Sequence, residues 1–555
     1  MKIELIKGYH DGPQTVEVQK ETTAQDLYRR FRQELPYIVV AAKIDNRIES
    51  LEYRFTKECT VEFLDLRTQA ASLIYQNSLI LLYLKAVEDV IGKVEVEIEN
   101  AINQGLYTEI KSSELLHQRD VKAIELRMRE LVHEDIPFIK EELTKEEAVA
   151  RFAEMGCPEK ITLLAENPTM KKVPFYSLSG YKDFFYSQMV PSTGYLNIFE
   201  LRKYRRGVLL RFPQLSSPGE IPEYSDEKML YQTFGEQTHW GKLMGINYVS
   251  DLNRKIEDGK IKDLIQLSEA LHERKIIEIA DMIIKKNRKI VLIAGPSSSG
   301  KTTFAQRLCI QLRVNGLDPL YMGTDDYFVE RADTPLDQYG ERNYEDIEAL
   351  DINLFNQNMK DLLAGKTVDL PTFDFMTGKK IFGKRITSIR SNQLIVIEGI
   401  HALNERISEA VPANNKMKIY ISALTPMQLD SYNRIHTTDM RLLRRIVRDS
   451  QFRSHDALMT LKLWDDVRRG EEQYVFPFQD SADIMFNTSL VYEFAVLKKY
   501  AEPLLKLIQP DEAVYTRAQR LLELLSHVRG MDDEAIPTNS ILREFIGGSI
   551  FKEAL

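Results

Sequence analysis

A stretch rich in glycine and serine lies between an apolar run and a helical pattern, and it carries the clearest chemistry of the sequence. Its residues are Gly295, Pro296, Ser297, Ser298, Ser299, Gly300, Lys301, Thr302 and Thr303. The spacing G-x-x-x-x-G-K-[ST] lets backbone N–H groups surround a polyphosphate, with Lys301 on the β- and γ-phosphates and the Thr302 hydroxyl on Mg²⁺. Residues 290–294 before the loop form a short apolar run rich in β-branched side chains, as expected for a buried parallel strand. This order of strand, loop and helix predicts a site for ATP and Mg²⁺.

Two further candidate strands end in carboxylates. Residues 317–322 lead into Asp325 and Asp326, and residues 393–397 lead into Glu398. Because the carboxyl ends of the strands in a doubly wound parallel sheet share one edge, these acids are expected beside Thr302. Together they could bind Mg²⁺, and one of them could accept the proton of an attacking hydroxyl.

An arginine-rich helical pattern follows further along the chain. Spacings of three and four put several guanidinium groups on one face, with Asp439 and Asp449 as the acids near in sequence: Arg441, Arg444, Arg445, Arg448 and Arg453. Phosphoryl transfer spreads negative charge over the equatorial oxygens, which arginines closing over the γ-phosphate stabilise.

These segments together resemble the uridine kinase and phosphoribulokinase family of P-loop kinases, over residues 286–510. The resemblance implies an α/β P-loop kinase fold, a parallel sheet flanked by helices, and these roles: catalytic for Asp325 and Lys301, metal binding for Thr302 and Glu398, a lid for Arg445, Arg448 and Arg453, and substrate binding for Asp325, Phe328, Asp351, Phe373 and Phe375. Asp351 is expected at the ribose hydroxyls, and residues 371–377 resemble a pyrimidine pocket.

The sequence departs from uridine–cytidine kinases at that pocket. Those enzymes place a histidine just after it, where this chain has Gly378, Lys379 and Lys380, and Phe373 replaces a tyrosine. An unpaired polar group costs about 1–3 kcal/mol, so loss of these partners weakens base discrimination. The expected reaction is transfer of the γ-phosphate of ATP to a primary hydroxyl, the 5′-OH of a nucleoside.

Two alternatives stay open. The acceptor could be a sugar phosphate or another small alcohol, with basic residues available for a substrate phosphate: Lys379, Lys380, Lys384 and Arg385. In the other alternative the protein is an RNA-binding regulator that uses its nucleotide site as a switch.

Residues 1–66 alternate apolar and polar residues in short runs around a capped helix that begins after Thr23. This β-grasp pattern resembles the TGS module of threonyl-tRNA synthetases, which implies a binding module. Residues 67–213 resemble the editing domain of threonyl- and alanyl-tRNA synthetases, in the stretches 126–131, 138–148 and 183–191. No histidine lies between His10 and His117, and the later loop has Phe185 and Met189, so we expect a degenerate domain without its metal or hydrolytic site.

RNA contact through residues 1–213 is an expectation that depends on a basic stretch, residues 202–206, with Arg211. The formal net charge of −9 predicts no global attraction to nucleic acid.

Residues 214–285 read as a linker that ends in a long helix over 264–284, and residues 511–555 as a helical tail. The chain of 555 residues has three cysteines far apart, which argues against disulfides, and no apolar signal segment. We expect a cytoplasmic protein with no membrane association; a homo-oligomer is compatible with the sequence.

Overall fold

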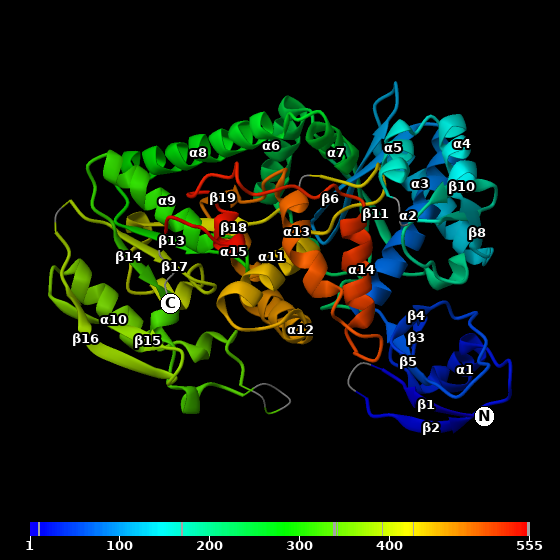
Figure 1. The fold of residues 1–555 in the computed structure, drawn as a ribbon, viewed down its shortest axis with the longest axis horizontal. Helices are drawn as coiled ribbons and strands as arrows, with labels where there is room; N and C mark the ends of the chain where they lie inside the picture. Colours follow the sequence, from blue (N-terminus) through cyan, green and yellow to red (C-terminus); the bar gives the residue numbers. More distant parts are fainter. Residues whose placement is uncertain are drawn as a thin grey trace.

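The computed structural model arranges the chain as two N-terminal modules beside a larger body (Figure 1). Residues 1–8, 11–167, 170–336, 340, 342–390, 392–425 and 427–551 are described, so residues 552–555 of the expected tail lie outside them. In Figure 1 the blue module and the cyan module lie on one side of the molecule, and the green-to-red remainder forms the larger body.

The first module is a five-stranded mixed sheet that holds one helix, as the β-grasp pattern predicts. Its elements are β1 (Lys2–Ile6), β2 (Gln14–Glu17), α1 (Ala24–Phe31), β3 (Val39–Ile44), β4 (Arg47–Glu49) and β5 (Thr60–Asp65). The strand order is β2-β1-β5-β3-β4, with β1 parallel to β5. Helix α1 begins at the expected cap, because the Thr23 hydroxyl accepts from the Asp26 N–H and the Asp26 carboxylate accepts from the Thr23 N–H.

The second module packs two small sheets around a long apolar helix. Its elements are α2 (Gln69–Ile91), β6 (Glu95–Ile102), β7 (Gly105–Lys111), α3 (Gln118–His133), β8 (Ile139–Thr144), α4 (Lys145–Met155), α5 (Pro158–Glu166), β9 (Lys172–Leu178), β10 (Tyr181–Phe184), β11 (Glu200–Tyr204) and β12 (Gly207–Arg211). The sheets have the orders β11-β12-β7-β6 and β10-β9-β8. Helix α2 is long and apolar enough to cross a membrane, but 67% of its most apolar window is buried inside this protein. This burial is typical of a core helix.

Three helices connect this module to the kinase-like sheet: α6 (Lys228–Met244), α7 (Val249–Glu257) and α8 (Ile261–Lys285). Helix α8 confirms the long helix expected over 264–284. Its apolar face, including Ile276 and Ile283, packs into the core beneath the large sheet. Its polar side holds the buried Arg307 through Glu273, at 2.6 Å.

The large sheet confirms the expected α/β architecture. Its five strands are β13 (Ile290–Ala294), β14 (Leu320–Gly323), β17 (Ile395–Glu398), β18 (Lys416–Ser422) and β19 (Ile484–Asn487). All pair in parallel, in the order β14-β17-β13-β18-β19. Because β13 is central and fully buried, the loop that follows it lies in the middle of the carboxyl edge of the sheet.

The remaining elements flank this sheet or extend from it. They are α9 (Lys301–Val314), α10 (Ile352–Leu363), the antiparallel hairpin β15 (Val368–Asp374) and β16 (Lys379–Thr387), α11 (Thr437–Phe452), α12 (Ala457–Tyr474), α13 (Glu493–Leu505), α14 (Tyr515–Ser526) and α15 (Arg543–Ile546). The segment expected as a tail packs into the main core, since Ala518, Leu521 and Ile541 are buried there.

A short segment of the larger body, residues 427–434, contacts the second N-terminal module. The Gln428 side chain donates to the backbone oxygen of Ile98 at 3.1 Å, and the Ile98 N–H donates to the Ser431 oxygen at 3.0 Å. Next to it, Lys160 and Asp183 form an ion pair at 2.6 Å, with both side chains 1% exposed. The second module is therefore held to the kinase body by specific polar contacts.

Candidate active site

The loop between β13 and α9 adopts the turn that phosphate binding requires. Ser298 and Gly300 have φ values of +57° and +84°, and α9 begins directly afterwards at Lys301. Such a turn directs successive backbone N–H groups inward at the positive end of a helix. The hydroxyls of Ser298 and Ser299 are buried and have no hydrogen-bond partner among the described residues. These unpaired donors fit a loop that binds an anion.

The expected metal site is assembled from the start of helix α9 and from the strands β14 and β17. The Thr302 hydroxyl donates to Glu398 Oε1 at 3.2 Å, and the Tyr321 hydroxyl donates to the same oxygen at 3.2 Å. Burial raises the pKa of Glu398 to about 7; Asp325 and Glu544 add to the increase, and Lys301 opposes it. The excess of negative charge at this site suits a cation.

These donors fit Mg²⁺ as it is held in nucleotide sites, by a hydroxyl and one carboxylate with the remaining oxygens from phosphates and water. Within the described ranges, no group of three or more His, Cys, Asp or Glu side chains could hold a metal on its own. The site is therefore suited to a metal that arrives with its nucleotide.

Asp325 lies after β14, in the short helix Thr324–Tyr327, at the same edge of the sheet. Solvent reaches its carboxylate, while the dense protein around it raises its pKa by desolvation. The charges of the nearby Lys301 and Arg453 oppose that increase.

The three arginines expected to form a lid gather around one acid. Arg445, Arg448 and Arg453 lie 3.2, 2.8 and 3.8 Å from the carboxylate of the buried Asp449. Arg445 also donates to the Ser297 hydroxyl at 2.9 Å, which connects this cluster to the phosphate loop. Repulsion from Arg448, together with desolvation, lowers the pKa of Arg453 to about 10. Among the described residues Asp449 is the one carboxylate paired with these three guanidinium groups, and Glu345 and Glu471 add negative charge near Arg445.

The other two arginines of this helix lie in the core and not in the cluster expected over the γ-phosphate. Arg441 and Arg444 are fully buried, with Glu471 Oε2 2.6 Å from Arg441 and Glu493 Oε2 2.9 Å from Arg444 Nε. Glu471 also accepts from the Ser297 N–H at 2.8 Å. Asp439 and Asp449 are the acids near these arginines in sequence, whereas Glu471 and Glu493 come from α12 and the start of α13. Arg441 and Arg444 therefore support the phosphate loop from the protein core.

The expected acceptor side is lined by the β15–β16 hairpin. Phe373 lies 5.7 Å from Phe328 and 5.1 Å from Phe375, measured between ring centroids, and both contacts are edge-to-face. Lys380 pairs with Asp351, and Arg385 pairs with Asp326 at 2.5 Å. The structure thus groups Phe328, Phe373 and Phe375 and places Asp351 against the same hairpin through Lys380, and two of the four candidate basic residues already have acid partners.

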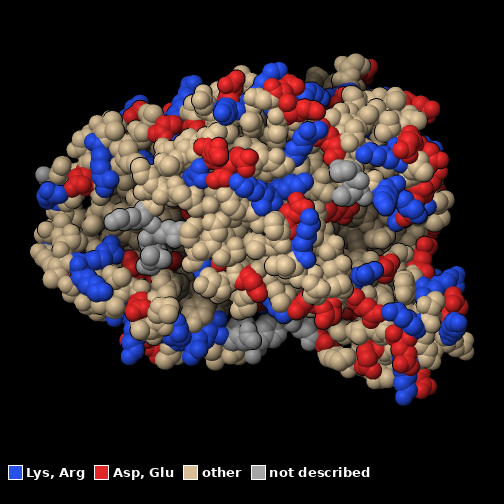
Figure 2. Space-filling model, viewed as in Figure 1, with Lys and Arg blue, Asp and Glu red and all other residues tan. Residues whose placement is uncertain are grey.

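The N-terminal modules contain no comparable site among their described residues. Phe185 and Met189 are buried in the apolar core of the second module. Arg211, expected in a basic cluster, is buried and pairs with Glu200 at 2.6 Å. In Figure 2 the positive and negative side chains of these modules are interspersed on the visible face. A pattern of this kind offers little focused attraction for a phosphate backbone.

Comparison with known proteins agrees with this division of the chain. Residues 290–492 match the model of the "Phosphoribulokinase / Uridine kinase family". Uridine kinase from Staphylococcus aureus (strain JH9) is 30% identical over 203 residues, which cover 36% of this chain and 87% of that protein. Threonine–tRNA ligase 1 from Bacillus subtilis (strain 168) is 28% identical over 185 residues of the N-terminal region, 33% of this chain. The chain spans 29% of the length of that ligase.

A solved structure described as a possible uridine kinase from Bacillus stearothermophilus is 20% identical, with a TM-score of 0.27; the alignment covers 39% of this chain and 98% of the other.

Proposed function

The chain belongs to the phosphoribulokinase/uridine kinase family, and from this premise we propose that it is an ATP- and Mg²⁺-dependent kinase that phosphorylates the 5′-hydroxyl of a nucleoside. The observation that carries the proposal is the meeting of three strand ends at one edge of the sheet. The phosphate loop follows β13, Asp325 follows β14, and Glu398 ends β17.

Each group at this edge has a definite task in the proposed reaction. Asp325 accepts the proton of the acceptor hydroxyl as that oxygen attacks the γ-phosphorus. Lys301 and the loop N–H groups hold the phosphates, and the arginines around Asp449 stabilise the charge that develops on the transferred group. Thr302 and Glu398 would hold Mg²⁺, which when bound neutralises phosphate charge.

The hairpin favours a nucleoside over a sugar phosphate. Phe328, Phe373 and Phe375 form an aromatic surface suited to the face of a base, whose stacking is worth about 1–3 kcal/mol. A substrate phosphate would need free cations in the same place. Two of the four cations named for that role, Lys380 and Arg385, are instead paired with Asp351 and Asp326, while the other two, Lys379 and Lys384, are exposed.

We infer no catalysis for residues 1–213. The second module buries the loop positions where a synthetase-type site would need imidazole or thiolate ligands. The proposed role of both modules is to support the kinase body, the second through its contacts with residues 427–434 and the first through the contacts of Asn46 with Asp511 and Thr516.

The test is ADP release by the full-length protein with Mg-ATP and a panel of nucleosides, sugars and sugar phosphates. Lys301→Ala serves as the blank, and Asp325→Asn is compared with wild type. We expect one nucleoside to stimulate release and Asp325→Asn to lower turnover at least 100-fold, with ATP binding unchanged. Near-normal turnover of Asp325→Asn would contradict the assignment of the base. Stimulation by sugar phosphates alone would contradict the assignment of the acceptor.

A further inference from the structure

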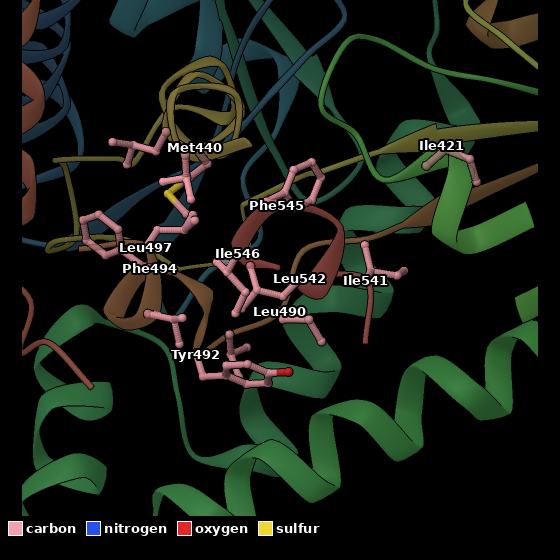
Figure 3. Packing of buried hydrophobic residues seen from close by; sticks show 14 of the residues in the cluster. Ile421, Met440, Leu490, Tyr492, Phe494, Leu497, Ile541, Leu542, Phe545 and Ile546 are labelled. Carbon is pink, nitrogen blue, oxygen red and sulfur yellow. The ribbon is translucent and has the colours of Figure 1, made fainter. Parts of the chain in front are cut away.

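The segment around α15 packs directly against the phosphate loop. Ile541, Leu542 and Phe545 are buried in the same core as β13, α9 and α11. Figure 3 shows Leu542, Phe545 and Ile546 grouped around the α15 segment, with Leu490 close by. The Phe545 ring centroid lies 4.9 Å from the guanidinium carbon of Arg444, which braces the loop. This segment is therefore part of the structure that surrounds the nucleotide site.

Glu544 reaches from this segment to the start of α9. Its Oε2 accepts from the Thr303 N–H at 3.0 Å, although the two residues are 241 positions apart. Thr303 lies in the first turn of α9, where the backbone N–H groups are without helical partners and attract anions. A carboxylate of the protein therefore occupies a donor of the phosphate-binding loop.

The segment also covers the loop glycine. A Cβ added to Gly300 would lie 2.5 Å from Ile541 Cγ2, so this side chain sits directly over the turn. Arg543 anchors the segment through Asp533 at 2.8 Å and the Ile536 oxygen at 3.0 Å. Gly547 and Gly548 follow with φ values of +86° and +74°, conformations that favour glycine. The anchors are thus on residues other than Glu544, so its half-buried side chain can leave the loop as the short helix α15 opens.

We propose that Glu544 is an internal competitor of nucleotide phosphate: its carboxylate holds the Thr303 N–H until ATP displaces it. This inference depends on the proposed function, since it requires the loop to bind a nucleotide. The carboxylate and a phosphate oxygen are acceptors of the same sign, so they repel each other and compete for one donor. While Glu544 accepts from the Thr303 N–H, it lowers the apparent affinity for ATP. In the nucleotide-free protein it also keeps this N–H hydrogen-bonded.

The first test compares the Kd of Mg-ADP and Mg-ATP, without acceptor, for full-length wild type, Glu544→Gln and the control Glu534→Gln. Glu534 is exposed in the same segment, so its variant removes one negative charge away from the loop. We expect Glu544→Gln to bind both nucleotides about tenfold more tightly, and Glu534→Gln to match wild type. An unchanged or weaker affinity of Glu544→Gln would overturn the inference, as would an equal gain in the control.

The second test uses the wild-type protein alone, so it stands even if the variant folds poorly. Hydrogen exchange of peptides from residues 541–548 is measured with and without Mg-ADP. Displacement of Glu544 predicts faster exchange there when the nucleotide binds, together with slower exchange in the loop at 296–303. Slower or unchanged exchange at 541–548 would mean that the segment is a fixed part of the site.

The two proposals can fail separately. If wild type binds nucleotide and phosphorylates an acceptor while Glu544→Gln has the same Kd, the inference fails and the proposed function stands. If neither protein binds nucleotide, both are overturned.

Discussion

The Thr302 hydroxyl and the Glu398 carboxylate lie 3.2 Å apart across 96 residues of sequence. Because both are expected to hold Mg²⁺, Glu398→Gln should lower kcat about 100-fold and move the half-saturating Mg²⁺ concentration upward. The measurement is turnover against Mg²⁺ concentration at saturating ATP.

Tyr321→Phe is the matched control for that experiment. It removes the other hydrogen bond to the same Glu398 oxygen and leaves the carboxylate in place. We expect its Mg²⁺ dependence to stay within a few-fold of wild type. A Glu398→Gln enzyme with a normal Mg²⁺ dependence would exclude Glu398 as a ligand.

Phe375→Ala tests the aromatic surface of the acceptor side. Phe375 is 53% exposed, so its loss should leave the fold intact. We expect the KM for the acceptor to rise about tenfold, the equivalent of about 1.4 kcal/mol, while the KM for ATP stays the same. Met376→Ala, whose side chain is 90% exposed on the same hairpin, should change neither constant. If Phe375→Ala and Met376→Ala raise the KM for the acceptor equally, the hairpin acts through its shape alone.

Asp183→Asn tests the junction between the halves. Asp183 and Lys160 both belong to the second module, beside residues 427–434, and Lys160 would lose its hydrogen-bonded partner and keep only the nearby charge of Asp430, in a site where both side chains are 1% exposed. We expect a loss of about 3–5 kcal/mol in the free energy of unfolding, measured by urea denaturation. Glu141→Gln, which breaks an exposed pair with Arg151 at 3.2 Å in the same module, should cost less than about 1 kcal/mol. Similar losses in the two variants would refute a special role for the buried pair.

Glu227 makes stability depend on pH. Burial raises the pKa of its carboxyl from 4.5 to about 7, while the Asn103 N–H and the Gln479 amide donate to it. The folded state therefore binds this proton more tightly than the unfolded state, so its stabilising effect is present below about pH 4.5 and is lost as the pH rises through about 7. Glu227→Gln stays neutral and should gain under about 1 kcal/mol at pH 5 but about 3 kcal/mol at pH 8.

Thermal or urea unfolding of the Glu227→Gln variant at the two pH values provides the measurement. Glu220→Gln, in an exposed part of the same linker, should show no such pH-dependent gain. A gain of Glu227→Gln that is equal at pH 5 and pH 8 would contradict the raised pKa.

The sequence predicted the family, the sheet and the meeting of the candidate residues at one edge of that sheet, because these depend on local signals. A strand, a glycine turn and a helix are adjacent in sequence, and parallel strands bring Asp325 and Glu398 to the same edge whatever the connections between them. The capping box at Thr23 and the long helix before β13 were predictable for the same reason.

Long-range partners were not predictable in this way. The acids that pair with Arg441 and Arg444 are 30 and 49 residues further along, so spacing alone grouped these two arginines with those expected over the γ-phosphate. Arg211 appeared to extend a basic stretch, yet its position on β12 turns it toward Glu200. The contact of Glu544 with Thr303 carries no sequence signal, since a single glutamate in a short helix is ordinary.

The distance along the chain between the loop and the segment that covers it also has a consequence for synthesis. At about 5–20 residues per second, the 241 residues that separate Thr303 from Glu544 take the ribosome roughly 10–50 s to add. During that interval the nascent kinase lacks Leu542 and Phe545, which are fully buried in its finished core. Its apolar surface stays open to water for that time, so this protein should require chaperone protection late in translation more than a kinase whose core closes early.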